Sequence, residues 1–310
     1  MSSPSVDDEF FVWTVRALSL ARSTGAPALA CLAGLLPTPA SAGRFALGLG
    51  ARPGQQRTGL VELAMLADLA LGGALRQRVG LTRPLPTLSL TLDLGGPLEQ
   101  EKPSPTVVVG ETSSAEHGVA TAGGSVQGHS GVVGHCTATF AVPSRGEQDE
   151  LPWDRPAGVQ TSTNTATACT TASELLPDRA TEEADRALAR ALHAADSASQ
   201  SWGDYLLARA TTTNGDDAVL SPSAVMTNRA GNVQGGVLFA LAANAGAPDD
   251  AASPPWPTSA TMRFLRGADA GTPITAVAEL QHATRRTVFT EVLLIQSDEI
   301  RAVASLIYRR

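Results

Sequence analysis

Residues 228–243 read Asn-Arg-Ala-Gly-Asn-Val-Gln-Gly-Gly-Val-Leu-Phe-Ala-Leu-Ala-Ala, so a glycine pair opens a helix that is apolar on every side. Residues 59–68 read Gly-Leu-Val-Glu-Leu-Ala-Met-Leu-Ala-Asp, a similar apolar helix without the glycine pair. Such helices must be enclosed by other elements rather than laid on a surface. The earlier helix carries Asp68 where the later one has Ala243, and a carboxylate inside an apolar helix needs a specific reason.

The two helices are the centres of a sequence repeat. A chain of 310 residues is long enough for two domains. In each half a short strand, a loop and the apolar helix precede several segments rich in Val, Ile and Thr, which predict strands. The expected elements are 44–50, a helix over 58–79, 85–94, 106–117, 119–127 and 131–142 in the first half, and 218–226, a helix over 233–245, 258–265, 274–282, 287–295 and 300–308 in the second.

This element order excludes a parallel sheet built from strand-helix-strand units, since several strands follow each helix without another helix between them. We predict an α+β fold in which each repeat is a long antiparallel meander wrapped round its central helix. The expected domains are an N-terminal repeat over 1–145, a linker rich in Pro, Gly, Ser and Thr over 146–175, and a C-terminal repeat over 176–310. Surface helices are expected at 8–21 and from Thr181 onward.

Composition limits the partners and the compartment. The net charge of −7 argues against a nucleic-acid partner, and no uninterrupted apolar run is long enough to span a membrane. Three cysteines without a CxxC pair argue against a disulfide framework and a metal site, which favours the cytoplasm. The apolar run 26–36 resembles part of a signal peptide, but its acidic lead and internal Pro27 argue against secretion.

The order of strand, glycine-opened buried helix and antiparallel strands, twice over, resembles the hotdog-fold acyl-CoA thioesterases of the phenylacetyl-CoA and 4-hydroxybenzoyl-CoA type. The resemblance covers about 44–142 and 218–308 and implies a tandem, double-hotdog form. In that family the site combines an Asn six residues before His-Gly-Gly, the N–H of the first glycine, a helix carboxylate eight residues after that glycine, and a strand Ser or Thr. The Asn and Gly come from one subunit of a dimer, and the acid and hydroxyl come from the other.

The resemblance implies one complete site that is divided between the repeats. The family Asn falls on Asn228 and its glycine on Gly235, whereas the carboxylate falls on Asp68 and the hydroxyl on Ser89. The first repeat lacks the Asn and Gly, having Pro53 and Leu60 there, and the second lacks the acid and hydroxyl, having Ala243 and Ala260. The chain is then an intrachain pseudo-dimer with one composite site and one inactive counterpart, and further assembly into homo-oligomers is left open.

These residue types suit thioester hydrolysis on physical grounds as well. A backbone N–H at a helix start supplies a donor and the positive end of the helix dipole to a carbonyl oxygen that gains charge. Gly235 has no Cβ to keep the substrate from that N–H. Asp68, with its pKa raised by apolar surroundings, would act as a general base on water or attack the thioester itself. We expect the Asp68 carboxylate and the Gly235 nitrogen to lie within about 10 Å, as one reacting carbonyl requires.

Other residues are candidates for substrate binding. Gln234, Gly236 and Thr87 adjoin the site residues in sequence, and Arg285 and Arg286, in a turn between strands, are candidates for the phosphates of coenzyme A. Coenzyme A would be part of the substrate, and no separate cofactor or metal is expected.

Each candidate also has an ordinary structural interpretation. Asp68 could pair with Arg76 or Arg78, the glycine pair could permit close packing, and Glu62 is explained as an acid in the first turn of its helix. The joint occurrence of Asn, Gly, Asp and Ser at family spacing favours the functional interpretation.

Gln234 departs from the family, which has His at this position. This substitution favours an alternative function, a protein that binds or senses an acyl-CoA without hydrolysing it. A hotdog hydratase acting on an enoyl-CoA is a further alternative, but that class pairs Asp with His, and no His lies near Asp68 or Asn228 in sequence.

Overall fold

The structure is a computed structural model that describes the ranges 26–37, 45–49, 58–79, 84–95, 107–112, 118–128, 131–143, 201–248 and 256–310, with residues 14, 17, 18, 20, 21, 188, 190 and 192. The five residues described between 14 and 21 are helical, as expected there. The linker over 146–175 and the start of the helix expected at Thr181 lie outside the described residues, so the three domain bounds stay predictions. None of the helices in the described ranges is both long and apolar enough to cross a membrane.

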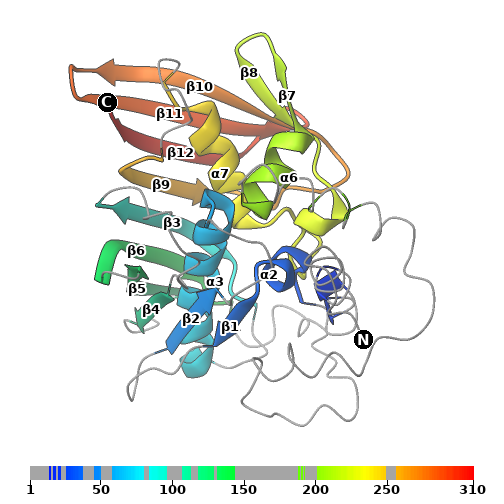
Figure 1. Cartoon of the computed structure of the whole chain (residues 1–310), viewed down its shortest axis with the longest axis vertical. Helices are drawn as coiled ribbons and strands as arrows, with labels where there is room; N and C mark the ends of the chain where they lie inside the picture. The colour runs from blue at the N-terminus through cyan, green and yellow to red at the C-terminus, as the bar shows by residue number, and fades with distance from the viewer. Residues whose placement is uncertain are drawn as a thin grey trace, which may run out of the picture.

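Within the described ranges, one sheet of twelve strands runs through both repeats (Figure 1). Its strand order is β1-β2-β4-β5-β6-β3-β9-β12-β11-β10-β8-β7, and every pair is antiparallel. The strands are β1 (Leu35–Pro37), β2 (Phe45–Leu49), β3 (Thr87–Leu94), β4 (Val107–Thr112), β5 (Val119–Gly128), β6 (Gly131–Ala141), β7 (Thr211–Asn214), β8 (Asp217–Leu220), β9 (Ser259–Phe264), β10 (Ile274–Ala283), β11 (Thr287–Gln296) and β12 (Glu299–Arg309).

The two repeats share one strand pattern. The order β2-β4-β5-β6-β3 in the first repeat matches β8-β10-β11-β12-β9 in the second. Within each repeat the strand that follows the central helix pairs with the last strand of the repeat, β3 with β6 and β9 with β12. The prediction that each strand pairs with the next one along the chain is therefore wrong for β3 and β9. The expected antiparallel α+β architecture is confirmed.

The two half-sheets join through β3 and β9. Five residue pairs, from Ser89 with Arg263 to Asp93 with Ser259, form this junction. Two side-chain hydrogen bonds across it link the hydroxyls of Thr91 and Thr261 and the Ser259 hydroxyl with Asp93. The repeats therefore form one continuous sheet rather than two separate bodies.

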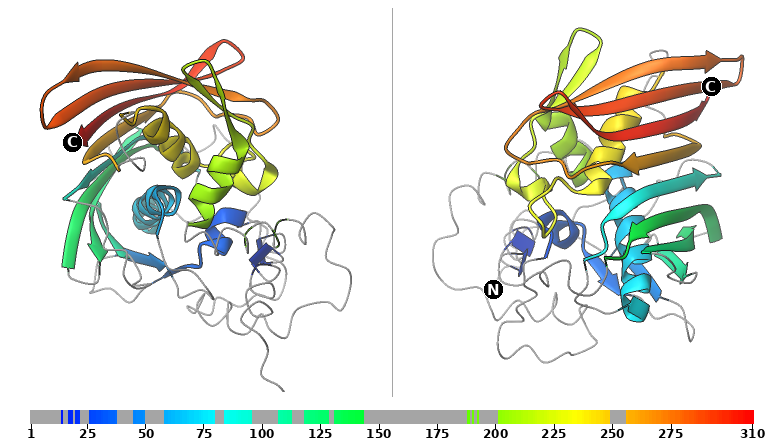
Figure 2. Two further views of the ribbon diagram at one scale, coloured as in Figure 1. Left: turned by 45° about the horizontal axis from the view of Figure 1, so that its top comes forward. Right: turned by 180° about the vertical axis from the view of Figure 1, so that it is seen from behind.

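The sheet curves round two central helices, α3 (Leu60–Val79) and α7 (Gly235–Ala245) (Figure 2). Side chains of both helices are buried on nearly all sides, as their apolar sequences predict. The helices also pack on each other, and Gly236 of α7 lies directly against the backbone of α3. A Cβ added there would lie 2.7 Å from the Met65 backbone nitrogen and 2.8 Å from the Val61 carbonyl oxygen.

Three shorter helices also have both ends in the described part: α2 (Ala28–Leu32), α6 (Trp202–Ala210) and the 3-10 helix η2 (Ala224–Met226). The strand expected over 218–226 is too long, because β8 ends at Leu220 and η2 occupies 224–226. Pro222 accounts for this, since proline has no N–H to continue the strand ladder. The sequence also gave no expectation of α2, β1, α6 or β7.

Candidate functional site

Asp68 and Gly235 meet where α3 passes the start of α7. A Cβ added at Gly235 would lie 3.7 Å from Asp68 Oδ2, which places the Gly235 nitrogen within about 6 Å of that oxygen by standard backbone geometry. The separation is inside the limit of about 10 Å set for a single site. The donor from the second repeat and the acid from the first therefore face the same space.

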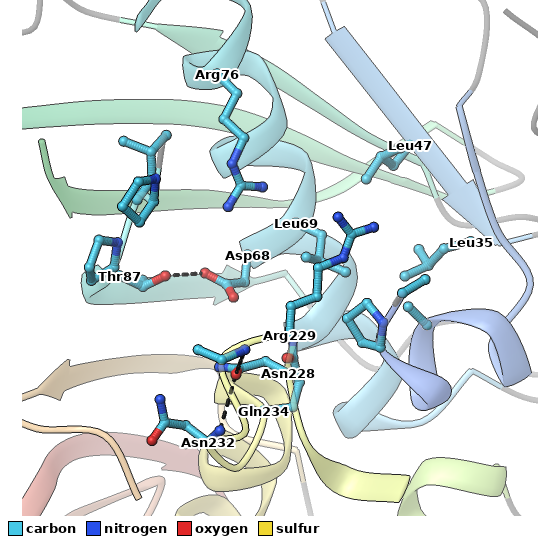
Figure 3. A pocket seen from close by; sticks show the side chains of 17 residues that line it. Leu35, Leu47, Asp68, Leu69, Arg76, Thr87, Asn228, Arg229, Asn232 and Gln234 are labelled. Atoms are coloured by element: carbon cyan, nitrogen blue, oxygen red, sulfur yellow. Dashed lines mark hydrogen bonds between the residues drawn. The ribbon is translucent and has the colours of Figure 1, made fainter. Parts of the chain in front are cut away.

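Thr87, at the start of β3, holds the Asp68 carboxylate. Its hydroxyl donates a 2.7 Å hydrogen bond to Asp68 Oδ1 (Figure 3). Burial raises the pKa of Asp68, and this effect outweighs the Thr87 hydrogen bond and the charge of Arg76, which both lower it. The result is a carboxyl group with one oxygen anchored by Thr87, the other directed toward Gly235, and a higher proton affinity than a surface aspartate.

Two cavities meet at Asp68. The larger has a volume of about 450 Å³ and extends along α3 toward α2, β1 and β2, and the smaller has about 360 Å³ and lies against Phe264 and Gly267. We call them the α3 arm and the β9 arm. Both arms are lined by Asp68, Pro86, Thr87, Asn228, Asn232 and Gln234.

Asn228 organises the loop that leads into α7. Its side-chain Oδ1 accepts hydrogen bonds from the backbone N–H groups of Ala230 and Asn232, at 2.9 and 3.2 Å. Gly231 in the same loop has φ +78°, a conformation that favours glycine. Asn228 therefore stabilises this turn and also lies on the wall of both arms, opposite Asp68 in Figure 3.

Two of the other candidates lie in or next to the site. Gln234 is buried at the position before the first turn of α7, and its side chain does not cap that helix. It lines both arms. Gly236, a candidate for substrate binding, lines neither arm and is instead packed against the backbone of α3.

Three candidates lie away from these cavities. Ser89 is paired with Arg263 in the sheet junction and lines neither arm, so Thr87 is the hydroxyl that contacts Asp68. A register shift between Thr87 and Ser89 explains why sequence spacing alone misplaced the hydroxyl. Arg285 and Arg286 lie in the turn between β10 and β11. Strand pairing aligns that turn with the Ser259 end of β9, whereas the site lies at the opposite, Phe264 end.

Sequence reasoning gave no binding role to two arginines that line the α3 arm. Arg76 follows Asp68 by two turns on α3, and Arg229 follows Asn228 directly. Their signal in the sequence was their proximity to the two strongest site candidates. Within the described ranges, neither arm is lined by a histidine, and His, Cys, Asp and Glu form no group of three or more that could hold a metal.

The start of α3 is the counterpart of the start of α7, and a carboxylate occupies it. Leu60 corresponds to Gly235 in the repeat, and the N–H groups of Leu60 and Val61 donate hydrogen bonds of 3.2 and 3.1 Å to the two carboxylate oxygens of Asp204. A side chain from α6 therefore occupies the start of α3, whereas the Gln234 side chain does not cap the start of α7.

Glu62 completes a reciprocal contact between the two helix starts. Its Oε1 accepts a 2.8 Å hydrogen bond from the N–H of Gly203 at the start of α6, while Asp204 caps α3. Glu62, the acid in the first turn of α3, therefore has a structural role, but it binds the start of α6 rather than the start of its own helix. Desolvation, and next the nearby Glu62, raise the pKa of Asp204 to about 6.

The raised pKa of Asp204 predicts that the stability of the fold depends on pH. Because the folded-state pKa of Asp204 is above its ordinary value, its proton stabilises the fold below about pH 4, and this contribution is lost as the pH rises through about 6. Urea unfolding of Asp204→Asn between pH 4 and 7 should show a smaller decline in the free energy of unfolding than the wild type shows. Identical slopes for the two proteins would remove Asp204 from this effect.

The comparisons with known proteins agree with this architecture. Residues 224–309 match a family model described as the acyl-CoA thioesterase N-terminal domain. A search of curated proteins found no significant match. Solved structures with a similar fold include an acyl-ACP thioesterase from Bacteroides thetaiotaomicron, at 10% identity over 86% of this chain and 97% of that chain, with a TM-score of 0.52.

Two further structures are similar to the same extent. One is the 12:0-ACP thioesterase from Umbellularia californica, at 9% identity over 88% of this chain and 100% of that chain, with a TM-score of 0.52. The other is the tesB protein from Mycobacterium avium subs paratuberculosis, at 10% identity over 93% and 99% of the two chains, with a TM-score of 0.52. At these identities the structures establish the shared fold, and the family match accounts for the second repeat. Residues 224–309 therefore match the acyl-CoA thioesterase domain family, and the chain as a whole shares the fold of these thioesterase structures.

Proposed function

We propose that the protein hydrolyses an acyl-CoA thioester at one composite site, with Asp68 from the first repeat and Gly235 from the second. The observation that carries this proposal is the approach of Asp68 Oδ2 to Gly235, 3.7 Å from the position of an added Cβ. Both halves of the site come from one chain, so the site does not require a second copy.

The Gly235 N–H is the donor to the carbonyl oxygen in this mechanism. The first N–H groups of a helix have no partner within the helix, and they carry the positive end of its dipole. The counterpart positions, Leu60 and Val61, bind both oxygens of Asp204. The N–H groups at the start of α3 thus bind an oxyanion within this protein, which supports the same role for the start of α7, where the Gln234 side chain does not cap the helix.

Asp68 Oδ2 is the reactive oxygen, because Thr87 already holds Oδ1. In one route Oδ2 takes a proton from water, and the water oxygen bonds to the carbonyl carbon. In the other, Oδ2 itself bonds to that carbon and an anhydride forms, which water then hydrolyses. Both routes break the C–S bond, the thiolate leaves and takes a proton, and a carboxylic acid remains. Single-turnover hydrolysis in ¹⁸O-water followed by mass spectrometry separates the routes. In the first route the product acid always takes an oxygen from water, whereas in the second it can take its new oxygen from Asp68 and leave unlabelled in that turnover.

The two arms suit a substrate that extends on both sides of the reacting carbonyl. The larger α3 arm is lined mainly by apolar side chains, including Leu35, Leu47 and Leu69, and suits the acyl group. The β9 arm is then left for the pantetheine side.

The direct test is release of free thiol from a panel of acyl-CoAs of different chain lengths. The panel should contain an acyl carrier protein thioester, because two of the structural neighbours are acyl-ACP thioesterases. Thiol release that depends on enzyme concentration supports the proposal. Tight binding without release across the panel would instead support the acyl-CoA-binding function that Gln234 favours.

Thr87 should set the acidic limb of the pH–rate profile. Asp68 must be deprotonated to react, so kcat/KM should rise as the pH passes through its raised pKa. The Thr87 hydrogen bond lowers that pKa, so Thr87→Val should move the limb to higher pH. Thr87→Ser keeps the hydroxyl and should leave the limb near its original position. A limb that stays in place in Thr87→Val would mean that another group titrates.

A further inference from the structure

Two arginines, one from each repeat, line the α3 arm. Arg76 lies on α3 and Arg229 lies in the loop before α7, and Figure 3 shows both side chains beside the cavity that contains Asp68. The cavity wall between them includes Leu69. The arginines are thus separated in sequence and brought together only by the docking of the repeats.

The charge of this arm is unlike that of the whole protein. Among the described residues of its wall, the charged ones are two arginines, Arg76 and Arg229, and one acid, Asp68, in a chain of net charge −7. Desolvation lowers the pKa of both arginines, and their mutual repulsion lowers the pKa of Arg229 further. An oxyanion between the guanidinium groups would offset that repulsion.

The position of Arg76 limits which oxyanion this is. Arg76 follows Asp68 by eight residues, which is about 12 Å along a helix axis. Side chains on a helix point toward its start, so the guanidinium lies closer to Asp68 than that. The extended pantetheine arm, from the sulfur of coenzyme A to its first phosphate, is longer than this separation. A charge at the end of a short acyl group fits the distance better than a phosphate does.

We propose that Arg76 and Arg229 together bind an oxyanion of the substrate, and that this oxyanion is a carboxylate at the free end of the acyl group. The preferred substrate is then a monothioester of a dicarboxylic acid. Arginine suits this role because its planar donors match a carboxylate in paired hydrogen bonds. The inference rests on the proposed function for the identity of the ligand as a thioester, but its test does not depend on turnover.

The test measures binding of stable thioether analogues by calorimetry. One analogue carries a carboxyalkyl group on coenzyme A, a second carries a neutral alkyl group of equal length, and a third carries the carboxyalkyl group on N-acetylcysteamine, which has no phosphate. The wild type should bind the first analogue about 10- to 100-fold more tightly than the second, the range expected for charge-assisted hydrogen bonds.

Arg76→Gln and Arg229→Gln should each reduce this preference toward one and weaken binding of the phosphate-free carboxyalkyl analogue. Arg229 is exposed, so its variant should fold even if Arg76→Gln does not. Arg209→Gln is the matched control, because Arg209 is an exposed arginine of α6 that lines neither arm. It should keep the wild-type preference.

Two results would overturn the inference. In the first, the arginine variants weaken both coenzyme A analogues equally and leave the phosphate-free analogue unaffected, which assigns the arginines to a phosphate. In the second, the preference for the carboxyl group is absent from the wild type or survives in both variants. A wild type that binds the carboxyalkyl analogue preferentially but releases no thiol from the matching thioester would refute hydrolysis and leave the carboxylate site standing.

Discussion

Replacing Asp68 with Asn is expected to reduce kcat for thioester hydrolysis by at least about 10²- to 10⁴-fold, the usual contribution of a general base. The substitution keeps the size of the side chain and an acceptor for the Thr87 hydroxyl. It removes the negative charge that either takes a proton from water or attacks the carbonyl carbon. Stopped assays of thiol release at several pH values would measure the loss, which should persist at every pH.

The same variant should be at least as stable as the wild type. Burial raises the pKa of Asp68, so the ionised carboxylate is held there at a cost to folding that a neutral amide avoids. Asp216→Asn, in the exposed turn between β7 and β8, is the control for the same chemical change. Wild-type turnover in a folded Asp68→Asn protein would remove Asp68 from the mechanism.

Replacing Gly236 with Ala adds one methyl group, and we expect it to lower the free energy of unfolding more than the same replacement at Gly235. The added Cβ would lie 2.7 Å from the Met65 nitrogen and 2.8 Å from the Val61 carbonyl oxygen, and these backbone atoms cannot turn aside. The helices α3 and α7 would have to separate, at a cost of about 1–3 kcal/mol or more. Urea unfolding should show the loss directly.

Gly235→Ala is the matched comparison, and its effect should be the opposite. The nearest atom to its added Cβ is Phe264 Cζ at 3.3 Å, the end of a side chain that can shift. Alanine also favours a helix over glycine by about 1 kcal/mol, so stability should hold or rise. Activity should fall about tenfold or more, because the methyl group would stand between the donor N–H and the carbonyl. If Gly236→Ala proves stable and Gly235→Ala fully active, the assignment of the two glycines is wrong.

The two central helices were predictable from sequence because their signals are local. An apolar helix, a glycine pair and an isolated acid each stand out within about twenty residues. The expected helices over 58–79 and 233–245 agree with α3 and α7 to within two residues at each end. Their enclosure by a curved antiparallel sheet followed from their lack of a polar face.

The features that sequence reasoning missed depend on contacts between distant segments. Thr87 rather than Ser89 reaches Asp68 because strand register shifts at that point. Asp204 caps a helix that begins 144 residues earlier in the chain, and no spacing rule connects the two positions. Arg76 and Arg229 likewise line one cavity only because the two repeats pack against each other.

The carboxylate of Asp204 at the start of α3 has a consequence for how this protein can change. In a symmetric dimer every substitution alters two identical sites at once, so a change that suits one end of a substrate is imposed on both. Here Asp204 caps α3 and Glu62 binds the start of α6, so under the proposed function a second site would need the removal of this helix cap as well as the introduction of new site residues. With one proposed site, each repeat can change independently of the other, and the cavity can become as unsymmetrical as its substrate.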